Sequence, residues 1–139
     1  MSKEIALNWL QNVTDTLFHK DLKGHLNLIS KSVSLTGVPG YENIDFSAWS
    51  AQCEHEFTNN LVKSVNYSGL KLLAANDDRI MFKTLETVEA IDGTKNSMGI
   101  EVLIQKENDG IWRVIQERVL PENEAIHDGL LANQPIMPT

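Results

Sequence analysis

The second half of the chain constrains the fold most, because four strand-length runs follow one another with only short polar turns between them. The runs cover residues 61–73, 80–91, 96–106 and 109–120. The turns that join them are rich in Asn, Asp and Gly, which are the residues that tight hairpin turns require. This pattern predicts an antiparallel meander.

The first run also predicts a bend in the sheet. Val65 and Tyr67 share one parity of the strand alternation, whereas Leu70 and Leu72 share the other, and Gly69 lies at the change. A bulge at a glycine lets a strand change phase and turn sharply. We therefore expect a curled sheet whose concave side leaves room for a small ligand.

The first half of the chain shows helical spacing instead. One helix is expected from Ile5 through Leu17, a shorter one follows Asp21 as N-cap, residues 33–36 read as a short strand, and Asp45 caps a third helix. The buried stripe of this third helix is Phe46, Trp49, Cys53 and Phe57. The predicted fold is α+β: a cone-shaped, curved antiparallel sheet of four long strands and one short one, with three N-terminal helices on its concave face.

Length and composition fit one globular domain. The chain has 139 residues, of which 42% are hydrophobic and 22% charged, the proportions of an ordinary soluble protein. We place the domain at residues 1–120. The polar segment 121–139 has too few apolar residues for a core of its own, and we expect a strap or disorder there.

Charge and motif content exclude several classes of function. A net charge of −7 without a run of Lys or Arg argues against nucleic-acid binding. No apolar stretch is long enough to span a membrane, and the N-terminus lacks the apolar core of a signal peptide, so the cytoplasm is the expected compartment. Cys53 is the single cysteine, the four histidines are scattered, and no motif implies a metal or a cofactor.

Three stretches carry a resemblance to a known group of proteins. They are residues 21–33, residues 40–44 with the helix that follows, and the closing run Asp-Gly-x-Trp-Arg-Val-Ile at 109–115. In this order, with the strands between them, they resemble the nuclear transport factor 2-like superfamily, in particular its SnoaL-like branch, over about residues 3–120. The resemblance implies a cone-shaped α+β barrel, often dimeric, with a pocket between sheet and helices.

The resemblance leaves the function open, because its members include isomerases, cyclases, dehydratases, hydrolases, binding proteins and dimerisation modules. One hypothesis is a protein that binds a small polar-apolar molecule in the concave pocket, with the activity of an acid–base enzyme such as an isomerase, dehydratase or cyclase. The alternative is a non-catalytic dimerisation or interaction module whose cavity is filled by Trp9, Trp49 and Phe57. The aspartate, tyrosine and acid of steroid isomerases do not map onto this chain residue by residue.

Strand register suggests which polar residues line the pocket. A three-residue loop at 108–110 predicts three facing pairs: Ile104 with Val114, Val102 with Gln116 and Ile100 with Arg118. Glu86 and Arg118 would then share the concave face, with Thr84 and Gln116 beside them. Glu86 would act as general base and Arg118 would hold an anionic group. A self-satisfied buried ion pair, or a different register, is the structural alternative.

The opposite face of the sheet mixes apolar and charged residues. Its predicted apolar members are Leu103, Ile111, Ile115 and Val119, and Glu101, Arg113 and Glu117 interrupt them. Such a mixture suits a subunit interface better than a solvated surface or a core. We therefore expect a homodimer through the convex face of the sheet.

Overall fold

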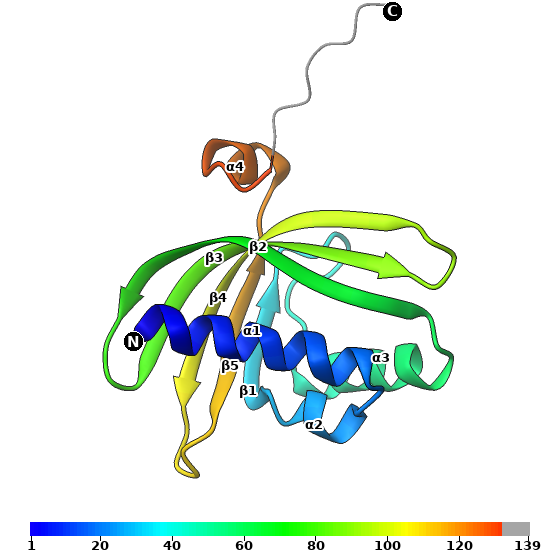
Figure 1. The fold of residues 1–139 in the computed structure, drawn as a ribbon, viewed down its shortest axis with the longest axis horizontal. Helices are drawn as coiled ribbons and strands as arrows, with labels where there is room; N and C mark the ends of the chain where they lie inside the picture. The colour runs from blue at the N-terminus through cyan, green and yellow to red at the C-terminus, as the bar shows by residue number, and fades with distance from the viewer. Residues whose placement is uncertain (132–139) are drawn as a thin grey trace, which may run out of the picture.

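The computed structural model describes residues 1–131, and its elements as far as the last strand follow the expected order, whereas the helix after that strand was not predicted. They are α1 (Ser2–Phe18), α2 (Leu22–Leu26), β1 (Ile29–Thr36), α3 (Phe46–Thr58), β2 (Val62–Ala75), β3 (Arg79–Ala90), β4 (Lys95–Lys106), β5 (Trp112–Val119) and α4 (Glu122–His127). Figure 1 shows α1 crossing in front of the sheet, with α2 and α3 near its C-terminal end and α4 apart from them. The predicted α+β class is confirmed.

The five strands form one mixed sheet in the order β1-β5-β4-β3-β2. The meander from β2 to β5 is antiparallel, as predicted. β1 is longer than expected and lies parallel to β5, so the sheet is not purely antiparallel. The reason is topological: α3 and the meander lie between β1 and β5 in the chain, and this long crossover permits parallel pairing.

Local sequence signals explain the helix boundaries. Asp21 accepts a hydrogen bond from the Gly24 amide at 3.0 Å, and Asp45 accepts one from the Ala48 amide at 2.9 Å. Each carboxylate satisfies an amide that the first turn leaves free. α2 ends at Leu26, although the apolar residues Leu22, Leu26 and Ile29 predict a helix as far as Ile29, because Ile29 begins the first strand.

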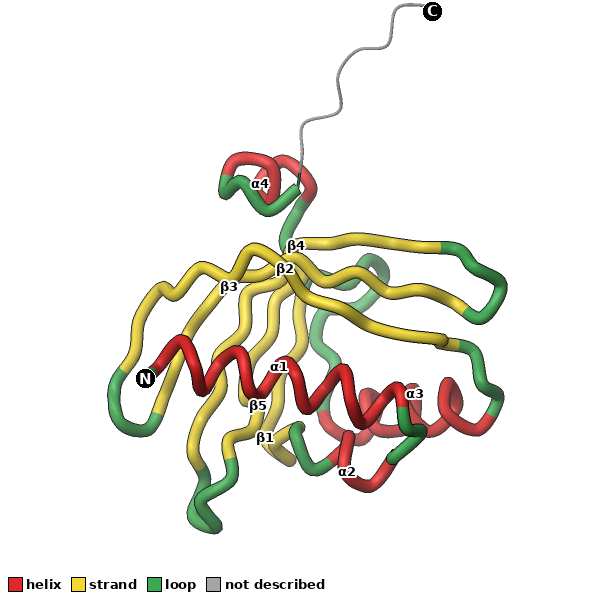
Figure 2. The backbone as a smooth tube through the Cα atoms, in the orientation of Figure 1, coloured by secondary structure: helices red, strands yellow, loops and turns green. Residues whose placement is uncertain are grey.

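The sheet bends where the sequence changes phase. Gly69 has φ +68°, and the pairing of β2 with β3 shifts register between Ser68 and Lys71. A side chain at such a φ would be strained, whereas glycine adopts it freely. The predicted bulge is confirmed, and Figure 2 shows the curved strands that result.

The core lies between the concave side of the sheet and α1. Its fully buried members include Phe82, Ile100, Val102 and Ile104 on adjacent strands, and the Trp9 ring packs edge-on against Phe82 with 6.5 Å between ring centroids. Burying each such side chain contributes about 1.5–3 kcal/mol. This packing holds α1 over the sheet and fixes the roof of the site described below.

Within the segment after Pro121, residues 122–127 form α4. α4 lies against the convex side, where Ala125 and Leu130 pack with Leu120. A Cβ added to Gly99 would lie 2.9 Å from the Ala125 Cβ, so this glycine lets the helix approach the sheet closely. The helix binds the sheet as a strap, while the remainder of the predicted tail, residues 132–139, lies outside the described residues.

Candidate functional site

A cavity of about 260 Å³ lies between the concave sheet, α1 and α3. Its wall is mostly apolar, with Trp9, Leu17 and Val13 from α1 and Val65, Val88 and Val114 among the residues from the sheet. Trp49 from α3 borders it on another side. The tryptophans line the cavity and leave it open, which the filled-cavity alternative does not predict.

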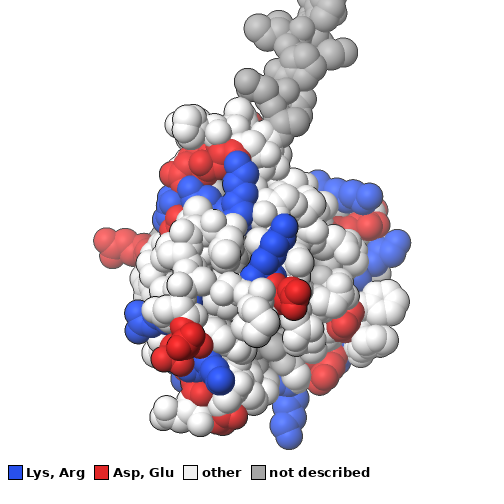
Figure 3. All heavy atoms as spheres, turned by 60° about the vertical axis from the view of Figure 1, so that its left-hand side comes forward, with Lys and Arg blue, Asp and Glu red and all other residues white. Residues whose placement is uncertain are grey.

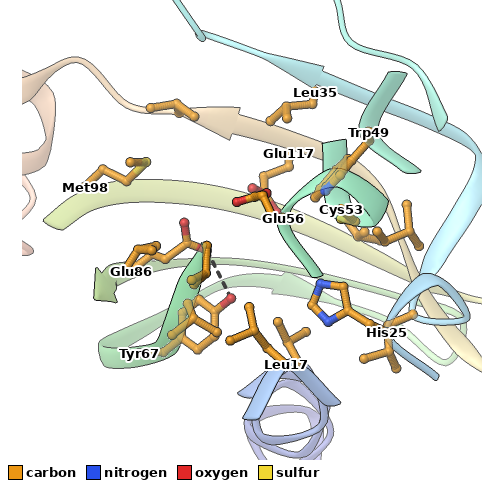
Figure 4. A pocket seen from close by; sticks show the side chains of 18 of the residues that line it. Leu17, His25, Leu35, Trp49, Cys53, Glu56, Tyr67, Glu86, Met98 and Glu117 are labelled. Carbon is orange, nitrogen blue, oxygen red and sulfur yellow. Dashed lines mark hydrogen bonds between the residues drawn. The ribbon is translucent and has the colours of Figure 1, made fainter. Parts of the chain in front are cut away.

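Four polar side chains from four elements point into this apolar space (Figure 4). Three are carboxyls, Glu56 of α3, Glu86 of β3 and Glu117 of β5, which we call the acid cluster. The fourth is Tyr67 of β2, whose hydroxyl donates a hydrogen bond to Glu86 Oε2 at 3.0 Å. The Tyr67–Glu86 pair follows from register, because these residues face each other across β2 and β3.

Glu117 enters the cavity because β5 contains a bulge. Val114 faces Ile104 as predicted, but Gln116 already faces Leu103 and Glu117 faces Val102. Ile115 is therefore an extra residue on β5, and every later side chain exchanges faces relative to a regular strand. The predicted pairs of Val102 with Gln116 and of Ile100 with Arg118 are wrong for this reason.

Arg118 and Gln116 consequently lie outside the cavity. Gln116 is exposed. Arg118 forms ion pairs on the convex side, from Nη2 to Glu101 Oε2 at 3.2 Å and to Glu124 Oε2 at 2.8 Å. Conversely Glu117 and Val119, expected on the convex side, line the cavity. Glu86 and Arg118 therefore do not share the concave face, and two further carboxyls, Glu56 and Glu117, line the cavity with Glu86 instead.

The remaining predicted pocket residues, Thr84, Trp9 and Phe57, differ in their position relative to the cavity. Thr84 is fully buried beside the cavity and donates its hydroxyl hydrogen bond to the Ser68 carbonyl at 2.8 Å, so it is satisfied within the sheet. Trp9 donates from Nε1 to the Leu28 carbonyl at 3.3 Å, which fixes its ring in the wall. Phe57 does not border the cavity; it packs against the ring of His25, with 5.2 Å between centroids.

Burial keeps the acid cluster from ionising easily. It raises the pKa of Glu117 well above the usual value, and the nearby Glu86 carboxylate adds to the increase. Burial also raises the pKa of Glu86; the hydrogen bond from Tyr67 opposes this, and the charge of Glu56 reinforces it. The pKa of Glu56 is raised by burial as well. The cavity therefore favours protonated carboxyls.

The other ionisable groups of the cavity are also held neutral. Burial lowers the pKa of His25 to about 4, although the charge of Asp21 opposes the shift, and Thr16 Oγ1 lies 2.9 Å from its Nδ1. Burial raises the pKa of Cys53 to about 12, and the Glu56 carboxylate contributes. A thiol with such a pKa does not supply a nucleophilic thiolate near neutral pH. His25 is likewise a neutral hydrogen-bonding group.

Sequence reasoning did not identify Glu56, Glu117, Tyr67 or His25 as site residues. The sequence could have indicated Tyr67, because Tyr67 lies two residues after Val65 and therefore on the same face of β2, and Val65 is buried. Glu56 lies three residues after Cys53 and so falls on the same side of α3. Glu117 gave no signal, since strict alternation from Val114 places it on the opposite face.

Paired carboxyls with raised pKa values can give and take protons near neutral pH. In the part of the chain that the structure describes, no Lys or Arg lines the cavity, and no three His, Cys, Asp or Glu side chains are grouped to hold a metal ion. No helix within residues 1–131 is both long and apolar enough to cross a membrane. The arrangement suits proton transfer or hydrogen bonding to an enclosed, mostly apolar molecule.

Comparison with known proteins identifies the fold. No protein-family profile matches the sequence, and no curated protein shows significant sequence similarity to it. Among solved structures, a nuclear transport factor 2-like protein of unknown function from Shewanella oneidensis superposes with a TM-score of 0.71 at 10% identity, covering 86% of this chain and 98% of that one.

Two further structures agree with it. ActVI-ORFA from Streptomyces coelicolor gives a TM-score of 0.67 at 14% identity, over 87% of this chain and 97% of its own. A protein named as a candidate aromatic ring hydroxylase, from Novosphingobium aromaticivorans, gives 0.66 at 8% identity, over 86% and 90%. At these identities the likeness concerns the fold alone. The chain has the nuclear transport factor 2-like fold.

Proposed function

We propose that this protein binds a small, largely apolar molecule in the cavity and acts on it as an acid–base enzyme of the isomerase, dehydratase or cyclase type, as in the SnoaL-like branch. The observation that carries the proposal is a pair of carboxyls, the half-buried Glu86 and the buried Glu117, facing an open apolar space. Burial raises the pKa of Glu86, so this carboxyl can serve as a base and, once protonated, as an acid.

The proposed roles follow from the hydrogen bonds. Glu86 receives the Tyr67 hydroxyl, which favours its ionised form, so Glu86 is the base that removes a proton from the ligand. Once Glu86 has taken this proton, it is the acid that returns it to another ligand atom, and Glu117 contacts the ligand from β5. In an isomerisation the two transfers cancel and the composition of the ligand is unchanged. Tyr67 positions Glu86.

Intrinsic fluorescence of the tryptophans tests the binding step, since Trp9 and Trp49 border the cavity. A library of small cyclic alcohols, ketones, amines and acids should contain members that change the emission with one-to-one stoichiometry. Leu35→Trp, which fills the cavity from β1, should abolish these changes, whereas Leu73→Trp at an exposed position should retain them. Equal binding by both variants, or none by the unmodified protein, would contradict the proposal.

We further propose that the protein is a cytoplasmic homodimer formed through the convex face. Met81, Leu103 and Ile115 are half-buried there, and α4 covers only the other part of that face. Pairing two copies would remove this apolar surface from water. Light scattering at micromolar concentration should give the mass of a dimer, and Leu103→Arg should give a monomer. A monomeric unmodified protein would refute the proposal.

A further inference from the structure

Glu117 is a buried carboxyl that lacks a partner. Its residue is only 8% exposed, and its side chain points into the cavity from β5 (Figure 4). Among residues 1–131 it has no hydrogen-bond donor; its surroundings supply only burial and the negative field of Glu86. No side-chain oxygen of the described residues is both buried and unpaired, so the Glu117 oxygens are accessible from the cavity, where a group that enters it can contact them.

The acid cluster as a whole is likewise uncompensated. Glu56 and Glu86 interact unfavourably with each other, and Glu86 with Glu117. Within the described lining there is no Lys or Arg, and His25 is held neutral. Elsewhere in the described chain, Lys63, Lys83, Arg113 and Arg118 each form an ion pair with an acid. The missing component of the cavity is therefore a positive charge.

The apolar wall specifies the rest of the ligand. Trp9 and Trp49 present aromatic surface to the cavity, and aromatic faces attract ammonium groups as well as apolar skeletons. The volume of about 260 Å³ lies just below the roughly 300–1,000 Å³ of drug-sized sites. An anionic ligand is disfavoured here, because it would meet three carboxyls and no cation.

We propose that the ligand of this cavity is a small organic cation, an ammonium group on a compact apolar or aromatic skeleton, with Glu117 as its principal ion-pair partner and Glu56 and Glu86 around it. This inference rests on the proposed small-molecule function and names its ligand class. Burial favours the protonated form of Glu117 in the empty cavity, and a bound cation favours its ionised form, so binding releases a proton to solvent. The amine thus binds in exchange for protons, which a neutral ligand does not do.

Three probes of nearly equal shape distinguish the charge of the ligand: phenethylamine, phenethyl alcohol and phenylacetate. Calorimetry on the full chain near neutral pH should show the amine binding at least about tenfold more tightly than the alcohol, the difference expected for one desolvated cation interaction. The carboxylate should bind most weakly. The heat for the amine should depend on the ionisation enthalpy of the buffer, because protons are released.

Matched variants locate the effect. Glu117→Gln should reduce the advantage of the amine over the alcohol to about threefold or less and diminish the proton release, while Glu101→Gln, on the convex side, should change neither. Circular dichroism and the unchanged affinity for the alcohol establish that the Glu117 variant is folded.

The possible failures are distinct. Tighter binding of the alcohol or of phenylacetate overturns the cation inference and leaves the small-molecule function standing. An amine advantage that persists in Glu117→Gln overturns the role of Glu117. If none of the three probes binds while only alcohols, ketones or acids of the fluorescence library do, the ligand class is wrong. If nothing in that library binds either, the proposed function fails with it.

Discussion

Acidic side chains lie on both sides of the sheet, but those on the convex side are paired with cations and those on the concave side are not. On the convex side, Glu101, Glu124 and Asp128 stand beside Arg118 and Lys83; we call these five residues the convex ion-pair network. Lys83 Nζ lies 2.7 Å from Asp128 Oδ2, and Arg118 joins the strands to α4. On the concave side the acid cluster has no cation among the residues that the structure describes.

The pKa directions reflect this difference. The hydrogen bond from Arg118 lowers the pKa of Glu124, and the one from Lys83 lowers that of Asp128, whereas burial raises the pKa of all three cavity carboxyls. Figure 3 shows basic and acidic side chains placed beside one another over the surface. Paired acids on a surface serve solubility and local structure, while unpaired buried acids oppose folding and so indicate a function.

The largest expected effect concerns His25, the neutral base of the cavity. Its folded-state pKa of about 4 lies below the ordinary 6.5, so the unfolded chain binds the additional proton between these values and stability falls as the pH falls through this window. Between pH 7 and pH 4 this amounts to about 3 kcal/mol. Urea titrations of the unmodified protein and of His25→Gln give the free energy of unfolding of each. The difference between the two should change by this amount between pH 7 and pH 4.

His55→Gln, which removes an exposed imidazole, serves as the matched control for the loss of a histidine. Parallel curves for His25→Gln and the unmodified protein would mean that the cavity does not desolvate its groups, and the contrast between the two faces would weaken.

The second-largest effect is expected from a substitution that displaces α4 and so disrupts the convex ion-pair network. Gly99→Val places side-chain atoms where Ala125 lies, and overpacking of this kind costs about 2 kcal/mol. Urea unfolding should report the loss, and hydrogen exchange of residues 122–131 should accelerate. Lys95→Val, on the same face of β4 and exposed, should change stability by no more than about 0.5 kcal/mol. Unaltered exchange in α4 would contradict the close packing.

The same substitution on both faces compares them directly. Glu117→Gln should stabilise the protein near neutral pH by about 1–2 kcal/mol, since it removes a carboxyl whose burial is uncompensated. Because the folded pKa is raised, the folded chain keeps a proton that the unfolded chain loses as the pH rises above 4.5, so the gain should disappear on acidification towards that value.

Glu101→Gln should instead leave stability unchanged or slightly lower it at every pH, because it removes a partner of Arg118. Thermal unfolding of both variants across this pH range provides the measurement. Destabilisation by Glu117→Gln would show that this carboxyl has a stabilising partner.

The smallest effect belongs to Arg118 itself. Its side chain is 35% exposed, so solvent screens its ion pairs, and Arg118→Met should cost no more than about 1 kcal/mol. The cost should diminish in high salt, and a double-mutant cycle with Glu101→Gln should give a coupling of a few tenths of a kcal/mol. A large, salt-independent loss would indicate that Arg118 has a role beyond the surface network.

Much of the fold was predictable because its signals are local. Asp45 caps α3 through one short hydrogen bond, Gly69 permits the bend of β2, and Gly110 adopts φ +81° in the last hairpin. The apolar stripe of α1 identified the side that packs on the sheet. Glu86 was placed on the concave parity of β3 by simple alternation, and it borders the cavity.

The rest of the site depended on interactions between distant strands. An extra residue at Ile115 inverts all later side chains of β5, since strand side chains alternate with period 2, and nothing in the local sequence distinguishes the bulged strand from a regular one. The docking of α4 over Gly99 likewise depends on a close approach between segments more than twenty residues apart.

By itself the sequence determined the types and order of the elements from α1 to β5, the curvature of the sheet and the mostly apolar character of its concave side, because caps, turns and alternation act over a few neighbouring residues. Only the tertiary structure decided that Glu117 faces the cavity while Arg118 faces α4, and that three carboxyls meet without a cation. Register and desolvation are properties of the packed strands, and the charge state of the site follows from them.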